Sequence, residues 1–316
     1  MTRSVDPAAG AAAPSVAGSV AGSVAGRGLT RIGGREFGWG SRTFVMGIIN
    51  ATPDSFSGDG LLGGHRAHAA DMGSIVDAGV SLGLTMAAND VDIIDIGGES
   101  TRPGHAPVGA ADEAARVIPL IRAVRGALPV VPISVDTTKP EVAAMALDAG
   151  AGLINDVWGV ADDDAMVRLA AARGVPIVLM HNRAEARYDD LIPEVIDDLR
   201  RAIDRALRVG VAEHDILIDP GFGFGKTPEH NLEILRALPE LGVLGRPILL
   251  GTSRKSTLGR VLDLPVGERL EATLATTALG IAGGADLIRV HDVRENVRAA
   301  RMTDAVVRGT WTETAP

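Results

Sequence analysis

The sequence predicts a (β/α)8 TIM barrel, an α/β fold, and three observations support this prediction. Eight short apolar runs rich in Val and Ile recur along the 316 residues, with helical patterns between them. Most of these runs end in polar residues, as expected where parallel strands present their carboxyl ends to a reaction site. The first run leads into N-A-T-P-D-S-F (50–56), which lacks the glycine-rich turn of a doubly wound dinucleotide-binding sheet. The barrel is therefore favoured over the doubly wound sheet.

Two segments precede the barrel strands. Residues 1–28 are rich in small residues and repeat V-A-G-S between Val16 and Gly26, so they cannot bury enough apolar surface to fold. We expect a disordered tail there and a single barrel domain over residues 29–316. Residues 29–44 alternate with glycine punctuation, which predicts a β-hairpin that plugs the amino-terminal mouth of the barrel.

The eight apolar runs have the composition of strands that are covered on both faces. They span residues 44–50, 91–98, 130–137, 152–158, 176–181, 216–220, 247–252 and 287–291.

Helical periodicity separates these strands. Apolar residues spaced three or four apart predict helices over 110–127, 192–209, 228–241, 268–282 and 294–307. A further helix is expected to begin near Pro140, where a proline and an acidic residue suit a first turn. Residues 58–89 are glycine-rich, so we expect a long first loop there and a helix only over 78–88.

Composition excludes several classes of function. The chain has no cysteine, which excludes disulfides, thiolate catalysis and cysteine-bound metals, and a reducing cytoplasm is the expected compartment. The net charge of −9 argues against a surface for nucleic acid or anionic membranes. An anionic ligand must therefore be bound by a local group of cations.

Polar side chains at the strand ends predict one shared site. They comprise carboxylates, carboxamides, cations and an imidazole: Asp136, Asp219, Asn50, Asn155, Lys255, Arg102, Arg289 and His291. Cations suit a phosphate or pyrophosphate, whereas carboxylates suit amidine-like or guanidine-like N–H donors, which they accept bidentately. The predicted ligand therefore has a polar heterocycle at one end and a phosphate group at the other.

Eight motifs of this chain resemble the dihydropteroate synthase family, a family of pterin-binding TIM barrels. They are V-M-G-I-I-N-A-T-P-D-S-F-S, D-I-I-D-I-G-G-E-S-T-R-P-G, I-S-V-D-T-T-K, I-N-D-V-W-G, L-M-H-N-R, D-P-G-F-G-F-G-K-T, G-T-S-R-K-S and R-V-H-D-V. They occur in the family's order over roughly residues 44–293. The resemblance implies condensation of 6-hydroxymethyl-7,8-dihydropterin pyrophosphate with p-aminobenzoate, with release of pyrophosphate, in folate biosynthesis. It also implies competition by sulfonamides.

The resemblance implies a role for each matching residue. The pterin would be bound by Asp136, Asn155, Met180, Asp219, Phe224, Lys255 and Arg289. Pyrophosphate would be held by Asn50, Arg289 and His291, and Asn50 would also contact a Mg²⁺ ion that pyrophosphate brings. The p-aminobenzoate site would comprise Phe56, Thr101, Arg102, Pro103 and Ser256. Catalysis would rest on Asp136, Asp219, Lys255, Arg289 and His291.

Several points stay open at this stage. The family often reads S-F-S-D-G-G where this chain reads S-F-S-G-D-G, so Asp59 is displaced by one residue. Arg254 is either functional or half of a solvated loop pair, whereas His181 is interpreted as structural. A pterin-dependent methyltransferase, a Schiff-base aldolase using Lys255 and a catalytically silent paralogue are the alternative functions. The resemblance also implies a homodimer formed through the last helices.

Overall fold

The computed structural model describes residues 27–51, 72–99, 108–161 and 163–311. The predicted tail lies outside these residues up to position 26. Arg27, which the prediction placed in the tail, donates a 2.8 Å hydrogen bond to the carbonyl oxygen of Gly284 and forms an ion pair with Asp286. Arg27 therefore contacts the barrel, although it lies two residues before the predicted domain boundary.

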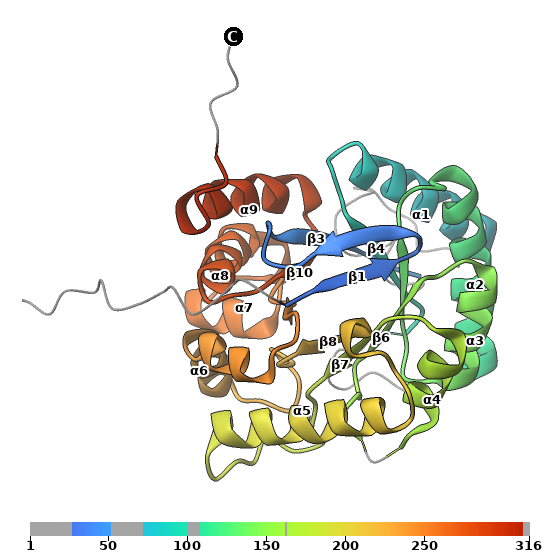
Figure 1. Cartoon of the computed structure of the whole chain (residues 1–316). Helices are drawn as coiled ribbons and strands as arrows, with labels where there is room; N and C mark the ends of the chain where they lie inside the picture. The colour runs from blue at the N-terminus through green and yellow to red at the C-terminus, as the bar shows by residue number, and fades with distance from the viewer. Residues whose placement is uncertain (1–26, 52–71, 100–107, 162, 312–316) are drawn as a thin grey trace, which may run out of the picture.

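Eight parallel strands form the barrel (Figure 1). They are β3 (Phe44–Asn50), β4 (Ile93–Gly97), β5 (Ile133–Asp136), β6 (Leu153–Asp156), β7 (Ile177–Met180), β8 (Ile216–Asp219), β9 (Leu249–Leu250) and β10 (Leu287–Val290). The strands pair in the order β8-β7-β6-β5-β4-β3-β10-β9, and a parallel bridge between Ile218 and Ile248 brings β8 beside β9. This closed order confirms the predicted barrel.

Helices surround the barrel and alternate with its strands (Figure 1). They are α1 (Met72–Ala87), α2 (Ala110–Ala127), α3 (Pro140–Ala149), α4 (Ala165–Arg173), α5 (Leu191–Arg208), α6 (Pro228–Arg236), α7 (Ser256–Leu262), α8 (Leu270–Ala282) and α9 (Val293–Val307). Short 3₁₀ helices span Glu213–Asp215, Leu238–Leu244 and Val266–Glu268. In the described part of the chain, no helix is long and apolar enough to cross a membrane.

The prediction for the first helix is wrong about its start. α1 begins at Met72 rather than near residue 78, although it contains Gly73, Gly79 and Gly83. At Gly79 a side chain would collide with the neighbouring helix, because an added Cβ would lie 2.5 Å from Leu120 Cδ1 of α2. The missing side chain thus permits close helix packing, which outweighs the low helix propensity of glycine.

The predicted hairpin is confirmed and lies across one end of the barrel (Figure 1). β1 (Leu29–Ile32) pairs antiparallel with β2 (Arg35–Gly38). Ile32, Phe37 and Trp39 are buried in one cluster with Phe44 and with the inward side chains near the strand starts. These large side chains therefore fill the amino-terminal mouth of the barrel, as the sequence predicts.

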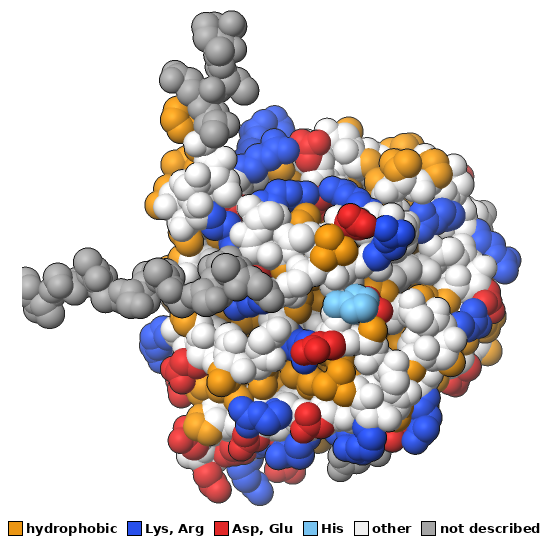
Figure 2. Space-filling view, in the orientation of Figure 1, with side chains coloured by type: hydrophobic (Ala, Val, Ile, Leu, Met, Phe, Trp, Pro, Cys, Tyr) orange, Lys and Arg blue, Asp and Glu red, His pale blue; other side chains and the backbone are white. Residues whose placement is uncertain are grey.

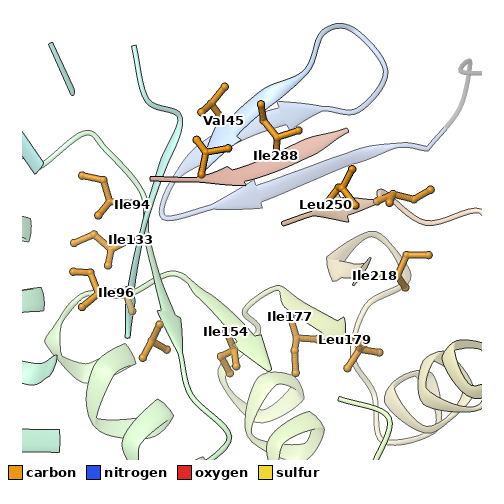
Figure 3. Close-up of a cluster of buried hydrophobic side chains, with 14 of the residues drawn as sticks. Val45, Ile94, Ile96, Ile133, Ile154, Ile177, Leu179, Ile218, Leu250 and Ile288 are labelled. Atoms are coloured by element: carbon orange, nitrogen blue, oxygen red, sulfur yellow. The ribbon is translucent and has the colours of Figure 1, made fainter. Parts of the chain in front are cut away.

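Side chains alternate between the two faces of each barrel strand. Val45, Ile94, Ile154, Ile177, Ile218 and Leu250 belong to the cluster beneath the helices (Figure 3). The adjacent residues Met46, Ile93, Leu153, Val178, Leu217 and Leu249 belong to the interior cluster with the hairpin. Because strands have a period of two, the residue two positions beyond each interior side chain points into the barrel again, nearer its carboxyl end.

Candidate functional site

The predicted site residues occupy this next interior layer. Asn155, Met180, Asp219 and Arg289 each lie two positions beyond an interior apolar residue of their own strand. Asp136 ends β5, and His291 lies two residues beyond Arg289. Strand periodicity therefore directs side chains from separate strands into one space at the carboxyl end of the barrel.

Arg289 is held between two acidic side chains. Its Nε donates to Asp95 Oδ2 and one terminal nitrogen donates to Asp136 Oδ2, both at 2.6 Å. Asp95 Oδ2 also accepts a 3.3 Å hydrogen bond from the Asn155 carboxamide. The Oδ1 atoms of Asp95 and Asp136 are buried and have no hydrogen-bond partner among the described residues. Buried carboxylate oxygens of this kind are costly unless they receive a donor, which a ligand can supply.

Burial changes the protonation of both predicted pterin-binding acids. Removal from water raises the pKa of Asp136 to about 7, although the Arg289 charge opposes this shift. Burial likewise raises the pKa of Asp219 to about 6, against hydrogen bonding from the Gly221 N–H and the positive charge of Lys255. Both acids therefore titrate close to neutral pH, a property common at reaction sites.

A second group of site residues comes from the loops after β8 and β9. The Lys255 ammonium lies 3.8 Å from the centroid of the Phe224 ring, a cation–π contact. Asp219 Oδ1 accepts a 2.6 Å hydrogen bond from the Gly221 N–H. At Gly223 (φ +84°) an added Cβ would lie 2.9 Å from Lys255 Cδ, so glycine is required where this loop approaches the lysine.

The remaining predicted residues fall into three groups. His291 Nδ1 lies 3.0 Å from the Ser253 hydroxyl, and Asn50 is the partly buried last residue of β3. Ser256 is exposed at the start of α7, next to Lys255. Residues Phe56, Asp59, Thr101, Arg102 and Pro103 lie outside the described part of the chain. The structure therefore places the predicted pterin and pyrophosphate residues but leaves most of the predicted p-aminobenzoate residues untested.

Arg254 and His181 both contact acidic side chains of the protein. Arg254 binds both carboxylate oxygens of Asp292, at 3.1 and 2.6 Å, which accounts for its charge without a ligand. His181 is buried, and its Nε2 lies 3.1 Å from Asp198 Oδ2. These contacts agree with a structural interpretation of both residues.

Two residues of this region were not predicted. Asp95 lies within an apolar run, and its place two residues after the interior Ile93 is the signal that could have identified it. Lys226 follows the G-F-G-F-G turn, and its contact with His181 depends on a distant strand, so no local pattern indicates it.

The resemblance implies a Mg²⁺ ion, and the side chains of the site can be compared with the ligands that this ion prefers. Among the described residues there is no group of three or more His, Asp or Glu side chains that could hold a metal ion. Mg²⁺ takes phosphate oxygens and water more readily than a protein cage. A single carboxamide oxygen on β3 fits an ion that arrives with pyrophosphate, and it does not fit a resident metal centre.

Known proteins resemble this chain over most of its length. A family described as "Pterin binding enzyme" matches residues 46–291. A dihydropteroate synthase from Clostridium beijerinckii is 48% identical over 279 residues, which cover 88% of this chain and 99% of the relative.

Solved structures give the same result. The Xanthomonas albilineans dihydropteroate synthase with 4-aminobenzoic acid has a TM-score of 0.79 and 41% identity, covering 88% of this chain and 97% of that one. The same enzyme in complex with 7,8-dihydropteroate has a TM-score of 0.77 and 39% identity, covering 88% and 98% of the two chains.

Proposed function

The chain belongs to the pterin binding enzyme family, and on this premise we propose that its interior cluster of acids and Arg289 is the pterin site. The reaction is that of dihydropteroate synthases. It condenses 6-hydroxymethyl-7,8-dihydropterin pyrophosphate with p-aminobenzoate and gives 7,8-dihydropteroate and pyrophosphate, a step of folate biosynthesis. The residue roles below are proposals that the geometry supports.

The Oδ1 atom of Asp136, which has no hydrogen-bond partner in the described part of the chain, carries the proposal for pterin binding. Arg289 fixes Oδ2 of the same carboxylate, so Oδ1 keeps a defined direction and can accept an N–H from the ring. Asp219 offers a second buried carboxylate, on β8, for the amino and ring N–H groups. Asn155 and Lys255 supply further polar contacts, and Met180 and Phe224 supply apolar walls. Such a slot matches a planar heterocycle with several N–H donors.

The reaction follows from the charge that must be stabilised. When the carbon–oxygen bond to pyrophosphate breaks, the electron pair leaves with pyrophosphate and positive charge spreads into the dihydropterin ring. The carboxylates of Asp136 and Asp219 favour this cation, whereas Arg289, His291 and Asn50 face the departing anion. The amine of p-aminobenzoate then forms the new carbon–nitrogen bond and releases a proton. This SN1-like order requires no protein nucleophile.

Magnesium enters this proposal as part of the substrate. An ion bound to pyrophosphate would neutralise its charge, and Asn50 is the residue proposed to contact it. Arg289 and His291 are the residues proposed to stabilise the remaining charge of the departing pyrophosphate.

Turnover is tested directly with purified protein. Incubation with the pterin pyrophosphate, p-aminobenzoate and Mg²⁺ should produce 7,8-dihydropteroate and pyrophosphate, and the pterin lacking pyrophosphate should give no product. A silent paralogue would produce neither, and a methyltransferase would show no requirement for the pyrophosphate. A Lys255→Ala variant that retained full turnover would contradict the role given to Lys255.

We further propose that the chain forms a homodimer through its last helices. Met302 and Val306, one helical turn apart on α9, are 66% and 72% exposed, and Leu279 on the neighbouring α8 is 59% exposed. Exposed apolar residues on adjacent elements are typical of an interface. Sedimentation should give twice the chain mass for the wild type and a shift towards monomer for Met302→Glu. Equal masses for the two proteins would contradict the interface.

A further inference from the structure

Lys226 carries a partly buried ammonium that the reaction scheme above does not use. Its Nζ lies 2.9 Å from His181 Nδ1 and 3.1 Å from the carbonyl oxygens of both Gly221 and Phe224. These three acceptors match the three hydrogens of an ammonium group. The charged form of Lys226 therefore satisfies the whole set, whereas a neutral amine would leave one acceptor without a donor.

The neighbouring histidine fits this assignment. Burial lowers the pKa of His181 to about 3, so its ring is neutral and carries one N–H. Because Nδ1 accepts from Lys226, the proton lies on Nε2, which faces Asp198 Oδ2 at 3.1 Å. Asp198 in turn accepts from Arg183 at 3.0 and 2.8 Å. A continuous polar chain thus runs from the loop after β8 to helix α5.

Lys226 closes the turn that shapes one wall of the pterin site. Gly221, Gly223 and Gly225 all have positive φ angles, so this turn has a tight conformation that glycine permits. One end of the turn donates to Asp219 through the Gly221 N–H, and its middle places Phe224 against Lys255. Lys226 bonds the carbonyl oxygens of those same residues, Gly221 and Phe224.

We propose that Lys226 is a positioning residue for pterin binding, which fixes the Gly221–Gly225 turn and through it the arrangement of Asp219, Phe224 and Lys255. Lys226 itself does not need to touch the substrate. Its effect belongs to the pterin half of the reaction, since p-aminobenzoate is assigned to other loops. The inference rests on the proposed pterin site, which wild-type turnover with the pterin pyrophosphate tests separately.

The surroundings of Lys226 predict a dependence on pH. Burial lowers the pKa of Lys226 to about 7, with Asp219 on β8 and Asp198 on α5 opposing this shift and Arg183 and Lys255 reinforcing it. Above that pH the ammonium loses a proton, and one of its three hydrogen bonds is lost. The turn should then loosen, so kcat/KM for the pterin substrate should fall on the alkaline side.

A Lys226→Met variant tests the proposal, because methionine keeps an unbranched side chain as far as Cε and lacks the charged Nζ group. We expect KM for the pterin pyrophosphate to rise by about tenfold or more, as for the loss of charged hydrogen bonds, while KM for p-aminobenzoate changes less than about twofold. Arg246→Met is the matched control. It removes a largely buried cation that pairs with Glu213 before β8 and β9, at the opposite end of the barrel. The control should leave both KM values unchanged.

The pH profile separates positioning from a general structural role. Wild-type kcat/KM for the pterin should decline at alkaline pH, and Lys226→Met should lose this decline while it keeps the acid limb. An alkaline limb that persists unchanged in the variant overturns the proposal, and so does an unaltered pterin KM. If the variant does not fold, the wild-type profile decides: a kcat/KM that shows no decline between about pH 7 and pH 9 contradicts the inference.

Discussion

At Asp95 a single fully buried carboxylate orients two residues of the proposed pterin site. One of its oxygens accepts from both Arg289 and Asn155, so an anion-facing residue and a pterin-facing residue share one anchor. Two acids around one guanidinium also balance charge in a site that excludes most solvent. We therefore regard Asp95 as a positioning residue for both halves of the substrate.

An Asp95→Asn variant should lower kcat/KM for the pterin pyrophosphate by roughly 10- to 100-fold, since Arg289 loses a charged hydrogen bond. Steady-state kinetics with varied pterin substrate measures this. Asp148→Asn is the control, because Asp148 pairs with Arg173 on the exposed surface, and its loss should not affect turnover. Equal kinetics for the two variants would rule out the anchoring role.

The raised pKa values of Asp136 and Asp219 predict an acid limb in the pH profile. Both groups must be carboxylates to accept N–H donors, so kcat/KM should fall as the pH drops through about 7 and then about 6. Asp219→Asn should remove the component at lower pH. A profile that stays level down to about pH 5 would contradict these assignments.

The same raised pKa values make activity fall at low pH but make the stability of the fold fall as the pH rises. Because both pKa values are higher in the folded protein than the ordinary aspartate value of 3.8, the folded state binds more protons between these limits. The contribution of these two acids to the free energy of unfolding should therefore decrease as the pH rises from about 4 to about 7.

Most residues of the pterin site could be predicted from the sequence, because each stands at the end of a recognisable strand. Asp136, Asn155 and Asp219 share that pattern. Asp95 is harder to single out, since the inward face of its strand must first be assigned to separate it from an acid that pairs with an outer helix. The contact between Lys226 and His181 joins segments 45 residues apart, and tertiary packing alone creates it.

Elements were predicted best where apolar periodicity is uninterrupted. β3 and α2 have the predicted bounds, Phe44–Asn50 and Ala110–Ala127. β9 is shorter than its predicted 247–252, because only Leu249 and Leu250 pair with β10. The apolar run at 247–252 is therefore longer than the segment that pairs with β10.

Glycines in α1 explain why its start was misplaced, and they give a test. Gly79→Ala should lower the free energy of unfolding by about 1–3 kcal/mol, because its Cβ would overlap Leu120 of α2. Gly126→Ala, at an exposed helical position with open space around it, should instead raise this energy by up to about 1 kcal/mol. Urea denaturation of both variants measures the difference. Equal shifts would show that propensity, rather than packing, decides the effect at Gly79.

For the whole molecule, the hairpin and the reaction site occupy opposite ends of one barrel. Basic and acidic side chains are interspersed around the hairpin on the face that Figure 2 shows. Three aromatic side chains, Phe37, Trp39 and Phe44, pack together beneath it. We therefore expect the hairpin end of the barrel to contribute mainly to stability and the opposite end to contribute to catalysis.

A Phe37→Ala variant should separate these two properties. Phe37 is fully buried, so its truncation should lower the free energy of unfolding by about 3–5 kcal/mol, while kcat of the folded enzyme stays near the wild-type value. Thermal denaturation and assays well below the melting temperature measure both effects. Val130→Ala, at an 80% exposed position, should change neither. A large loss of kcat in folded Phe37→Ala would show that the two ends are coupled.

The barrel is closed at a seam between β8 and β9, where fewer residues pair than between β8 and β7. Between β8 and β9 the join rests on the bridge of Ile218 with Ile248, whereas β8 and β7 are paired over four residues. Asp219 ends one strand at this seam, and Lys255 lies five residues past the other. A pterin bound by both side chains would span this weakest junction of the barrel. Substrate binding would therefore help to hold β8 and β9 together.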